Sequence, residues 1–223
     1  MLNKTKFINK IKPKKVKIHG KVVKRLVINP KDTLIGLKGG LKLVKDISVS
    51  GGTILLVGNG RKYKYLMESY AREVKQPFMY RRWVHGLLSN DTLLKDHLLR
   101  YGSKIDRAHM SDWLRRNKVT DFLIRYEGYL NNLNQPSLVI FLNTSQLSDA
   151  LDEVNSLNIP SLGLATTSMD RSKLTYPIPS NDQSLKTSAL FVELVKEAIK
   201  EGVKQRKTVL KHMAKKVNKT NKK

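Results

Sequence analysis

Short apolar runs alternate with stretches of helical periodicity along this chain, and this alternation limits the folds that it can adopt. Residues 53–57, 137–142 and 161–165 are apolar runs of strand length. Helices are predicted after the first two runs, because apolar residues recur there on one face: Tyr63, Leu66, Met67, Tyr70, Ala71 and Val74, then Leu147, Ala150, Leu151 and Val154. Such alternation predicts an α/β fold, with a parallel sheet flanked by helices in the doubly wound, flavodoxin-like manner.

The remaining segments extend this pattern at both ends. A short strand is predicted at 78–80, and a helix at 34–44 despite Gly39 and Gly40, which each cost roughly 1 kcal/mol relative to alanine. The last helix is expected from about 184 to 201, and its inward residues would be Leu190, Phe191, Leu194, Val195, Ala198 and Ile199. Two amphipathic stretches within 91–133 predict an inserted helical hairpin that protrudes from the sheet, or two helices packed flat on the core.

Positive charge is concentrated at the two ends of the chain. The formal net charge is +25, from 43 Lys and Arg against 18 Asp and Glu. Residues 1–25 hold ten basic residues and 202–223 hold nine, and neither segment has an acidic residue. We therefore expect a core of 26–90 and 134–201, the insertion 91–133, a basic N-terminal extension 1–25 and a basic C-terminal tail 202–223. The tails predict a polyanionic partner, on which they would become ordered.

Several classes of site are excluded by the residues themselves. The chain has no cysteine, which excludes disulfides and thiolate catalysis, and its five histidines show no metal-ligand spacing. We predict no catalytic residue and no metal, because a P-loop and a GxSxG elbow are absent as well. No apolar run is long enough to cross a bilayer, so membrane insertion is not expected. The acidic residues Asp149, Asp152 and Glu153 are predicted to lie on the solvated side of their helix.

The turn Gly58-Asn59-Gly60 has two interpretations. It resembles the opening of a dinucleotide loop, which leaves open an RNA-modifying enzyme with a nucleotide-type cofactor. However, Tyr63 stands at the third glycine position, and the basic pair Arg81-Arg82 stands where an acid is expected. A tight turn without any cofactor is therefore favoured. Arg61 and Lys62 would then face phosphate or solvent at the start of the following helix.

Basic residues are the candidate ligands for RNA. Trp83 is expected to be a core residue, whereas its neighbours Arg81 and Arg82 could contact RNA or lie along the surface. A membrane-surface role for the tails is the other alternative, although they lack the aromatic and leucine face of an interfacial helix. The candidate RNA contacts are Arg61, Lys62, Arg81, Arg82, Lys14, Lys15, Lys17, Arg25, Arg206, Lys207, Lys211, Lys215 and Lys216.

Two blocks resemble a known family. Residues 51–58 through 82–90 resemble the first signature of the bacterial and organellar small-subunit ribosomal protein two, and residues 158–160 with 176–182 and 198–199 resemble the second. Both blocks, 82–90 and 176–182, look like turns that end buried strands. The resemblance covers about 31–202, and its structural signature residues are Trp83, Gly86, Asn90, Pro160, Pro179, Asn181 and Asp182.

The resemblance implies a function as well as a fold. Members have a parallel α/β sheet with a protruding helical hairpin, bind small-subunit ribosomal RNA between head and body beside other small-subunit proteins, and have no catalytic role or cofactor. This chain departs from the family at His85, Ser89, Asn143 and Thr166-Thr167, and Lys-rich residues replace an aromatic, Met-rich segment near the start. Such drift favours a mitochondrial member, with the bacterial cytoplasm or a plastid as alternatives.

Overall fold

Five parallel strands form the central sheet. The computed structural model describes residues 12–18, 21–90, 134–166 and 169–220, with 92, 96, 126, 128 and 129. The strands are β3 (Ile54–Val57), β4 (Phe78–Met79), β5 (Leu138–Phe141), β6 (Ser161–Ala165) and β7 (Tyr176–Pro179). Their order is β4-β3-β5-β6-β7, and every pairing is parallel. This is the flavodoxin-like order, which confirms the predicted doubly wound fold.

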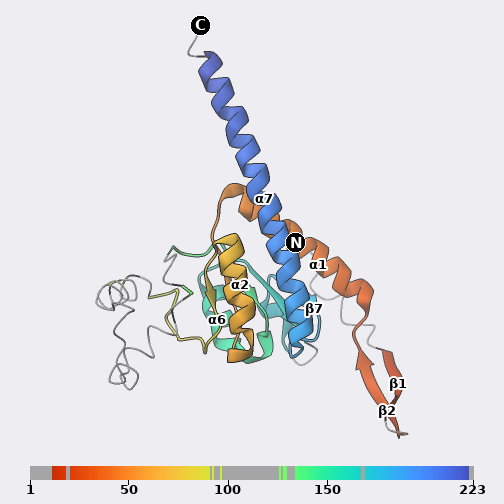
Figure 1. The fold of residues 1–223 in the computed structure, drawn as a ribbon. Helices are drawn as coiled ribbons and strands as arrows, with labels where there is room; N and C mark the ends of the chain where they lie inside the picture. The colour runs from red at the N-terminus through yellow and green to blue at the C-terminus, as the bar shows by residue number, and fades with distance from the viewer. Residues whose placement is uncertain are drawn as a thin grey trace.

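Helices cover both faces of this sheet (Figure 1). One face carries α1 (Pro30–Ser50), α2 (Lys64–Val74) and α7 (Leu185–Thr220), and the other carries α6 (Ser148–Ser156). Within the described residues, 3-10 turns lie in the connections at η1 (Arg61–Tyr63), η3 (Thr144–Gln146) and η4 (Arg171–Lys173). The predicted strands at 53–57, 78–80, 137–142 and 161–165 are confirmed, and so are the helices after the first and third of them.

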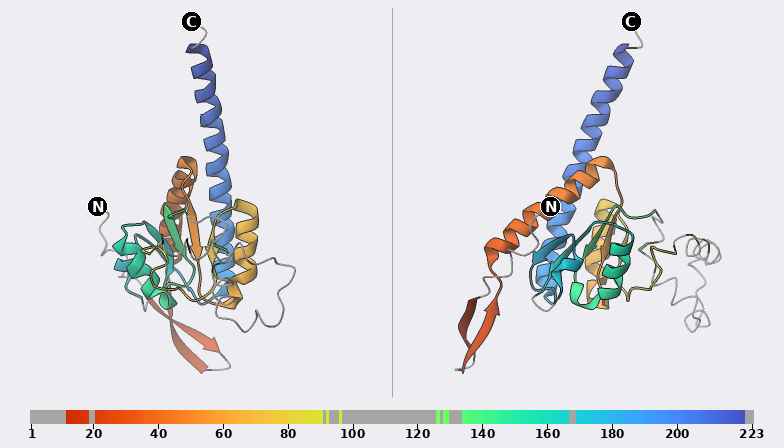
Figure 2. Two further views of the ribbon diagram at one scale, coloured as in Figure 1. Left: turned by 90° about the vertical axis from the view of Figure 1, so that its left-hand side faces the viewer. Right: turned by 180° about the vertical axis from the view of Figure 1, so that it is seen from behind.

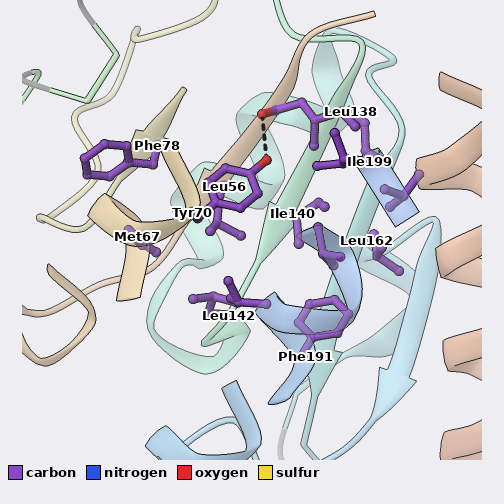
Figure 3. Packing of buried hydrophobic residues seen from close by; sticks show 14 of the residues in the cluster. Leu56, Met67, Tyr70, Phe78, Leu138, Ile140, Leu142, Leu162, Phe191 and Ile199 are labelled. Carbon is purple, nitrogen blue, oxygen red and sulfur yellow. Dashed lines mark hydrogen bonds between the residues drawn. The ribbon is translucent and has the colours of Figure 1, made fainter. Parts of the chain in front are cut away.

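The alternation of side chains along each strand divides the core in two. In β3, Ile54 and Leu56 belong to the cluster under α1, α2 and α7, whereas Leu55 and Val57 belong to the cluster under α6. Tyr70 of α2 is fully buried in the first cluster, and its hydroxyl donates to the carbonyl of Ile54 at 3.3 Å (Figure 3). Burial raises the pKa of Tyr70 well above its ordinary value, so the phenol stays neutral.

The capping residues of helix α1 determine where it begins and ends, and a glycine on its inner side allows close packing on the sheet. Asn29 caps it by accepting from the Lys31 backbone N–H at 3.1 Å, and Gly51 ends it at a φ of 84°. Gly40 lies so close to β6 that an added Cβ would stand 2.6 Å from Leu162, whereas Gly39 has nothing within 4 Å. Gly202 of α7 lets that helix cross α1, where an added Cβ would stand 2.6 Å from the Cβ of Ser48.

Helix α7 and strand β7 differ from the sequence prediction. The helix was expected to end near 201, but it continues to Thr220, because its last part is rich in helix formers and has no proline. Leu190, expected to point inward, is 64% exposed, and Val192 is buried in its place. The segment 176–179, expected to be a turn, is a strand, because Tyr176–Pro179 pairs with β6 along the free edge of the sheet.

Helices α2 and α7 are joined by charged residues. Lys196 is almost fully buried, and its Nζ lies 2.6 Å from Glu73 Oε1 and 2.7 Å from Glu193 Oε1. Lys200 also binds the carboxylate of Glu73. Hydrogen bonds from Lys196 and Lys200 lower the pKa of Glu73 to about 2. Glu73 therefore remains charged under all ordinary conditions and links the two helices.

Parts of the basic ends lie in regular elements, with residues 12–18 and 21–27 in two strands and residues 202–220 in α7. Strands β1 (Lys12–Ile18) and β2 (Lys21–Val27) form an antiparallel hairpin. Their residues of high β propensity are Val16, Ile18, Val22, Val23 and Val27. The hairpin and the end of α7 leave the sheet domain in opposite directions (Figures 1 and 2). The predicted helical hairpin at 91–133 lies outside the described residues, except that Tyr126 and Tyr129 are buried under the sheet.

Candidate nucleic-acid interface

The connections after β3 and β4 bring four candidate cations to one edge of the sheet. The backbone N–H of Gly58 donates to the carbonyl of Met79 at 2.8 Å, and that of Gly60 donates to the carbonyl of Tyr80 at 2.8 Å. Arg61 and Lys62 follow the first connection, and Arg81 and Arg82 follow the second. Because parallel strands all end at the same edge, these residues from separate parts of the sequence share one surface.

Three of these four cations have exposed side chains. Arg61, Lys62 and Arg82 are exposed, whereas Arg81 is half-buried with its guanidinium 5.7 Å from the Tyr80 ring. The Arg81 Nε is buried and has no hydrogen-bond partner among the described residues. Lys62 Nζ lies 4.9 Å from the Tyr63 ring and donates to the carbonyl of Gln183 at 3.4 Å.

The start of α2 adds to the positive character of this edge. Its first turn has no acidic residue, and Tyr63 at the cap position makes no side-chain capping bond. Backbone N–H groups at a helix start favour anions, and cations beside them favour anions further. The edge is therefore suited to phosphate.

The crevice where doubly wound proteins bind nucleotides is bridged here by the chain itself. This crevice lies at the ends of β3 and β5, where the strand order reverses. The Asn59 backbone N–H donates to Asn143 Oδ1 at 2.8 Å, and Asn143 Nδ2 donates to the Asn59 carbonyl at 3.1 Å. Gly58 lies close against the following helix, since an added Cβ would stand 2.6 Å from Met67 Cε and 3.2 Å from the ring of Tyr63. This geometry favours the tight-turn interpretation of Gly58-Asn59-Gly60.

The first block, 82–90, is wrapped around the carboxylate of Glu153. Trp83 Nε1 donates to it at 2.8 Å, and so do the backbone N–H groups of Gly86, Leu88 and Ser89 at 3.2, 2.8 and 3.0 Å. The Ser89 hydroxyl adds a fifth bond at 3.1 Å. Trp83 is 6% exposed, which confirms the prediction that it is a core residue. Gly86 has a φ of 82°, a conformation that glycine favours, and the turn it makes directs the N–H groups at the acid.

Glu153 is therefore not the solvated residue that helical periodicity predicted. Burial alone would raise the pKa of its carboxyl, but the hydrogen bonds from Ser89, Trp83 and Leu88 outweigh burial and hold that pKa below its ordinary value. Its neighbour Asp149 is exposed and lies 3.3 Å from His85 Nε2. The signal that could have found Glu153 is the glycine turn in 82–90, since successive N–H groups in such a turn form a concave site for an anion.

The second block is held by another carboxylate, that of Asp182. This residue is fully buried, and its Oδ2 accepts from the backbone N–H of Ser145 at 3.1 Å and from the Ser145 hydroxyl at 2.7 Å. Its carbonyl accepts from the Tyr63 hydroxyl at 3.2 Å. Asn181 is exposed and makes a local turn by accepting from the Gln183 backbone N–H at 3.0 Å.

Pro160, Pro179 and Asn90 make hydrogen bonds through their backbone atoms. The carbonyl of Pro179 accepts from the Thr33 hydroxyl at 2.6 Å, and that of Pro160 accepts from the Val139 backbone N–H at 3.1 Å. The Asn90 backbone N–H donates to the carbonyl of Gly86 at 3.0 Å. These signature residues thus shape the connections at both ends of the sheet.

The other candidate cations lie away from this edge. Arg206, Lys207 and Lys211 are exposed on α7, and the guanidinium of Arg206 also lies against Gly51, at the end of α1. Lys215 and Lys216 fall in α7 as well, and their side chains are outside the described part of the chain. Lys14, Lys15, Lys17 and Arg25 fall in the β1–β2 hairpin.

Neither a metal site nor a membrane span occurs in the part of the chain that the structure describes. Among these residues, no group of three or more His, Cys, Asp or Glu could hold a metal ion. Also within these ranges, none of the helices has the length and apolar character needed to cross a membrane.

Comparisons with known proteins agree with the signature blocks. A family model described as "Ribosomal protein S2" matches residues 5–202, so the match begins upstream of residue 31 and includes most of the basic N-terminal segment. The chain is 30% identical over 190 residues to the small ribosomal subunit protein uS2 of Clavibacter michiganensis. The matched residues cover 81% of this chain and 60% of that protein. This chain is 29% identical over 189 residues to uS2 of Rhodococcus erythropolis, covering 81% and 66% of the two chains.

A third relative shows the same partial coverage. The uS2 protein of Ureaplasma parvum serovar 3 is 29% identical over 194 residues, which is 82% of this chain and 56% of that one. The chain thus spans about 60% of the length of the curated relatives that it matches first.

Proposed function

This chain belongs to the ribosomal protein S2 family, and from this we propose that it is a structural constituent of the small ribosomal subunit rather than an enzyme. It binds small-subunit ribosomal RNA between head and body, and it packs against neighbouring small-subunit proteins. The observation that carries the proposal is the family match over residues 5–202, which contains both signature blocks. We also propose the division into a core of 26–90 and 134–201, an insertion at 91–133, and basic segments 1–25 and 202–223.

The RNA contacts that we propose are the cations predicted from the sequence. Arg61, Lys62, Arg81 and Arg82 are on one edge of the sheet, beside an uncapped helix start. The other proposed contacts are in the hairpin and along α7, which project from opposite sides of the domain (Figure 2). The domain docks by the shape of its connections, and the projecting basic elements neutralise RNA backbone at a distance from it.

Sedimentation tests the function directly. A lysate of the source cells is run on a sucrose gradient in low and in high salt, and the chain is followed across the fractions. Stoichiometric comigration with the small ribosomal subunit, persisting in high salt, is the expected result. Recovery only at the top of the gradient would overturn the proposal, and nucleotide binding at the Gly58 loop and lipid flotation would then be measured.

Charge variants test the proposed contacts. The double variant Arg61→Gln with Arg82→Gln is compared with Lys38→Gln and Lys42→Gln, which remove the same charge from exposed positions on α1. Each duplex phosphate that is no longer neutralised should reduce the slope of log affinity against log salt by about 0.9, or by about 0.7 for single-stranded RNA. The α1 control should leave the slope unchanged, and equal slopes for both variants would refute the edge contacts.

Truncation of α7 tests its projecting part. Removing residues 208–223 takes away six basic residues but keeps Gly202 and Arg206, which lie against α1. The fold should be retained, and the salt dependence of RNA binding should be flatter than that of the full chain.

We place the chain in the mitochondrial ribosome. The support is its drift from the family at His85, Ser89, Asn143 and Thr166-Thr167, together with identities of 30% or less to the bacterial relatives above. Fractionation of the source cells tests this location. The chain is expected to be enriched in the mitochondrial fraction. Enrichment in plastids or in bacterial cytoplasm would overturn the mitochondrial location.

A further inference from the structure

The stripe of α7 that packs on the sheet domain continues along the helix past the end of that domain. The stripe recurs at alternating spacings of three and four residues, and its buried positions are Val192, Val195, Ile199 and Gly202. The same spacing continues through Arg206, Val209 and Met213. This part of the helix projects from the sheet domain, so its stripe is directed to solvent (Figures 1 and 2).

The projecting part of the stripe is apolar beyond Arg206. The guanidinium of Arg206 lies against Gly51, where α1 ends. Val209, Leu210 and Met213 come next, and their side chains are 45%, 54% and 59% exposed. Single exposed apolar residues are common on protein surfaces, but three neighbours on one side of a helix form a continuous apolar surface. A helix in water depends on the packing of such a face for its stability, so this surface is suited to a partner.

The cations of the same part of α7 lie on the opposite side of the helix. Lys204, Lys207 and Lys211 are exposed, and their spacings of three and four residues place them on one side. Lys211 is two residues from both Val209 and Met213, and a step of two residues turns a helix by about 200°. The helix therefore has an apolar side and a basic side, and residues 202–223 hold no acidic residue.

We infer that the apolar side formed by Val209, Leu210 and Met213 binds an α-helix of a neighbouring small-subunit protein, and that this helix has an apolar stripe bordered by acidic residues. The inference rests on the proposed function and deepens it by naming the surface and the kind of partner. A stripe with spacings of three and four residues packs on a second helix with the same spacings. Acidic residues beside the partner's stripe complement a segment whose charged residues are all basic.

Neither RNA nor a second copy of this chain fits the apolar side. RNA backbone presents charged phosphate oxygens, and apolar side chains packed against them would leave these oxygens without donors. A second copy would place nine basic residues of one tail beside nine of the other, with no acidic residue in either. RNA is instead suited to the basic side, where Lys207 and Lys211 are proposed contacts.

Cross-linking from single cysteines tests the two sides separately. The chain has no cysteine, so Met213→Cys and Lys211→Cys each introduce one thiol into the full-length chain, on the apolar side and on the basic side. Each variant carries a photoactivatable diazirine on this thiol and is assembled into small ribosomal subunits, which are purified and irradiated. Met213→Cys should be joined to a different protein, and mass spectrometry should locate the link in a segment with apolar residues at helical spacing and acidic residues beside them. Lys211→Cys should be joined to ribosomal RNA.

Polar substitution measures how much the apolar side contributes to binding. Leu210→Gln with Met213→Gln keeps good helix formers, and Lys207→Gln with Lys211→Gln is the matched control on the basic side. The loss of two apolar contacts should weaken retention in the subunit by about 10- to 100-fold. Because salt does not screen apolar contacts, this loss should persist in high salt, whereas the effect of the control should decrease. Circular dichroism of the free proteins should show equal helix content in both variants.

The outcomes separate this inference from the proposed function. If the wild-type chain sediments with the small subunit but Met213→Cys is joined only to RNA, is joined to a second copy of this chain or gives no product, the inference is wrong and the ribosomal function stands. Retention of Leu210→Gln with Met213→Gln equal to that of the wild-type chain would also overturn it. If the wild-type chain does not sediment with the small subunit, the proposed function fails, and the inference fails with it.

Discussion

Glu153→Ala removes the single carboxylate that holds the first signature block, and it should destabilise the whole domain. Five donors from residues 83–89 share this carboxylate, which comes from α6, far from them in the sequence. Alanine is a good helix former, so α6 itself is retained. The decrease in stability therefore reports on the block and not on the helix.

The expected decrease in the free energy of unfolding comes from the hydrogen-bond donors that water cannot easily reach. Ser89 is exposed, so its two donors can turn to water, but the indole N–H of Trp83 and the N–H groups of Gly86 and Leu88 are partly buried. A buried donor left without an acceptor costs about 1–3 kcal/mol, so three at the lower limit amount to about 3 kcal/mol. For a domain of this size that corresponds to about 6–12 °C in Tm.

Urea unfolding at pH 7, followed by circular dichroism, measures this free energy. Glu197→Ala is the control, because Glu197 is exposed on α7 and its removal should change the free energy of unfolding by less than about 0.5 kcal/mol. Glu153→Gln should fall between the two, since it keeps one acceptor oxygen but turns an amide N–H toward other donors. If Glu153→Ala unfolds within about 0.5 kcal/mol of the control, the carboxylate does not hold the block.

Three further predictions concern the helix contacts and the connections of the sheet. The pKa of Glu73 is lowered from 4.5 to about 2, so its ion pairs stabilise the fold above pH 4.5 and are lost as the pH falls toward 2. Glu73→Gln should therefore weaken the dependence of the free energy of unfolding on pH over that range. An unchanged pH dependence would contradict this prediction. Gly39→Ala should stabilise α1 by up to about 1 kcal/mol, because an added Cβ meets nothing there. Gly202→Ala should instead lower Tm, because its Cβ would meet the α1 backbone. Equal effects of the two variants in thermal melts would refute the close crossing of α7 over α1. Asn143→Asp should cost about 1–3 kcal/mol in urea unfolding at pH 7, since a carboxylate cannot donate to the Asn59 carbonyl, and a neutral result would show that this bridge does not stabilise the fold.

Much of the fold could be predicted from the sequence, because its signals are local. The strand at 54–57 is a continuous apolar run, which matches a strand that is buried on both faces of the sheet. The apolar stripe of α2 recurs at helical spacing, because one side of that helix meets the core at every turn. The two signature blocks likewise indicated the family, since each block is a continuous run of residues that can be recognised in the sequence. The net charge of +25 indicated an anionic partner without any coordinates.

The prediction failed where distant segments decide a residue's environment. Glu153 occupies a position that helical periodicity assigns to solvent, and only the fold brings residues 83–89 to it. The segment 176–179 became a strand because β6 offers it a free edge, and Leu190 is exposed because α1 and α2 meet another side of α7.

The sequence by itself determined the fold class, the core stripes and the positive charge, because each depends on the order and spacing of neighbouring residues. Only the tertiary structure decided which acidic residues hold the connections of the sheet and which cations share one of its edges. Those properties depend on contacts between residues far apart in the chain, and local periodicity contains no information about such pairings.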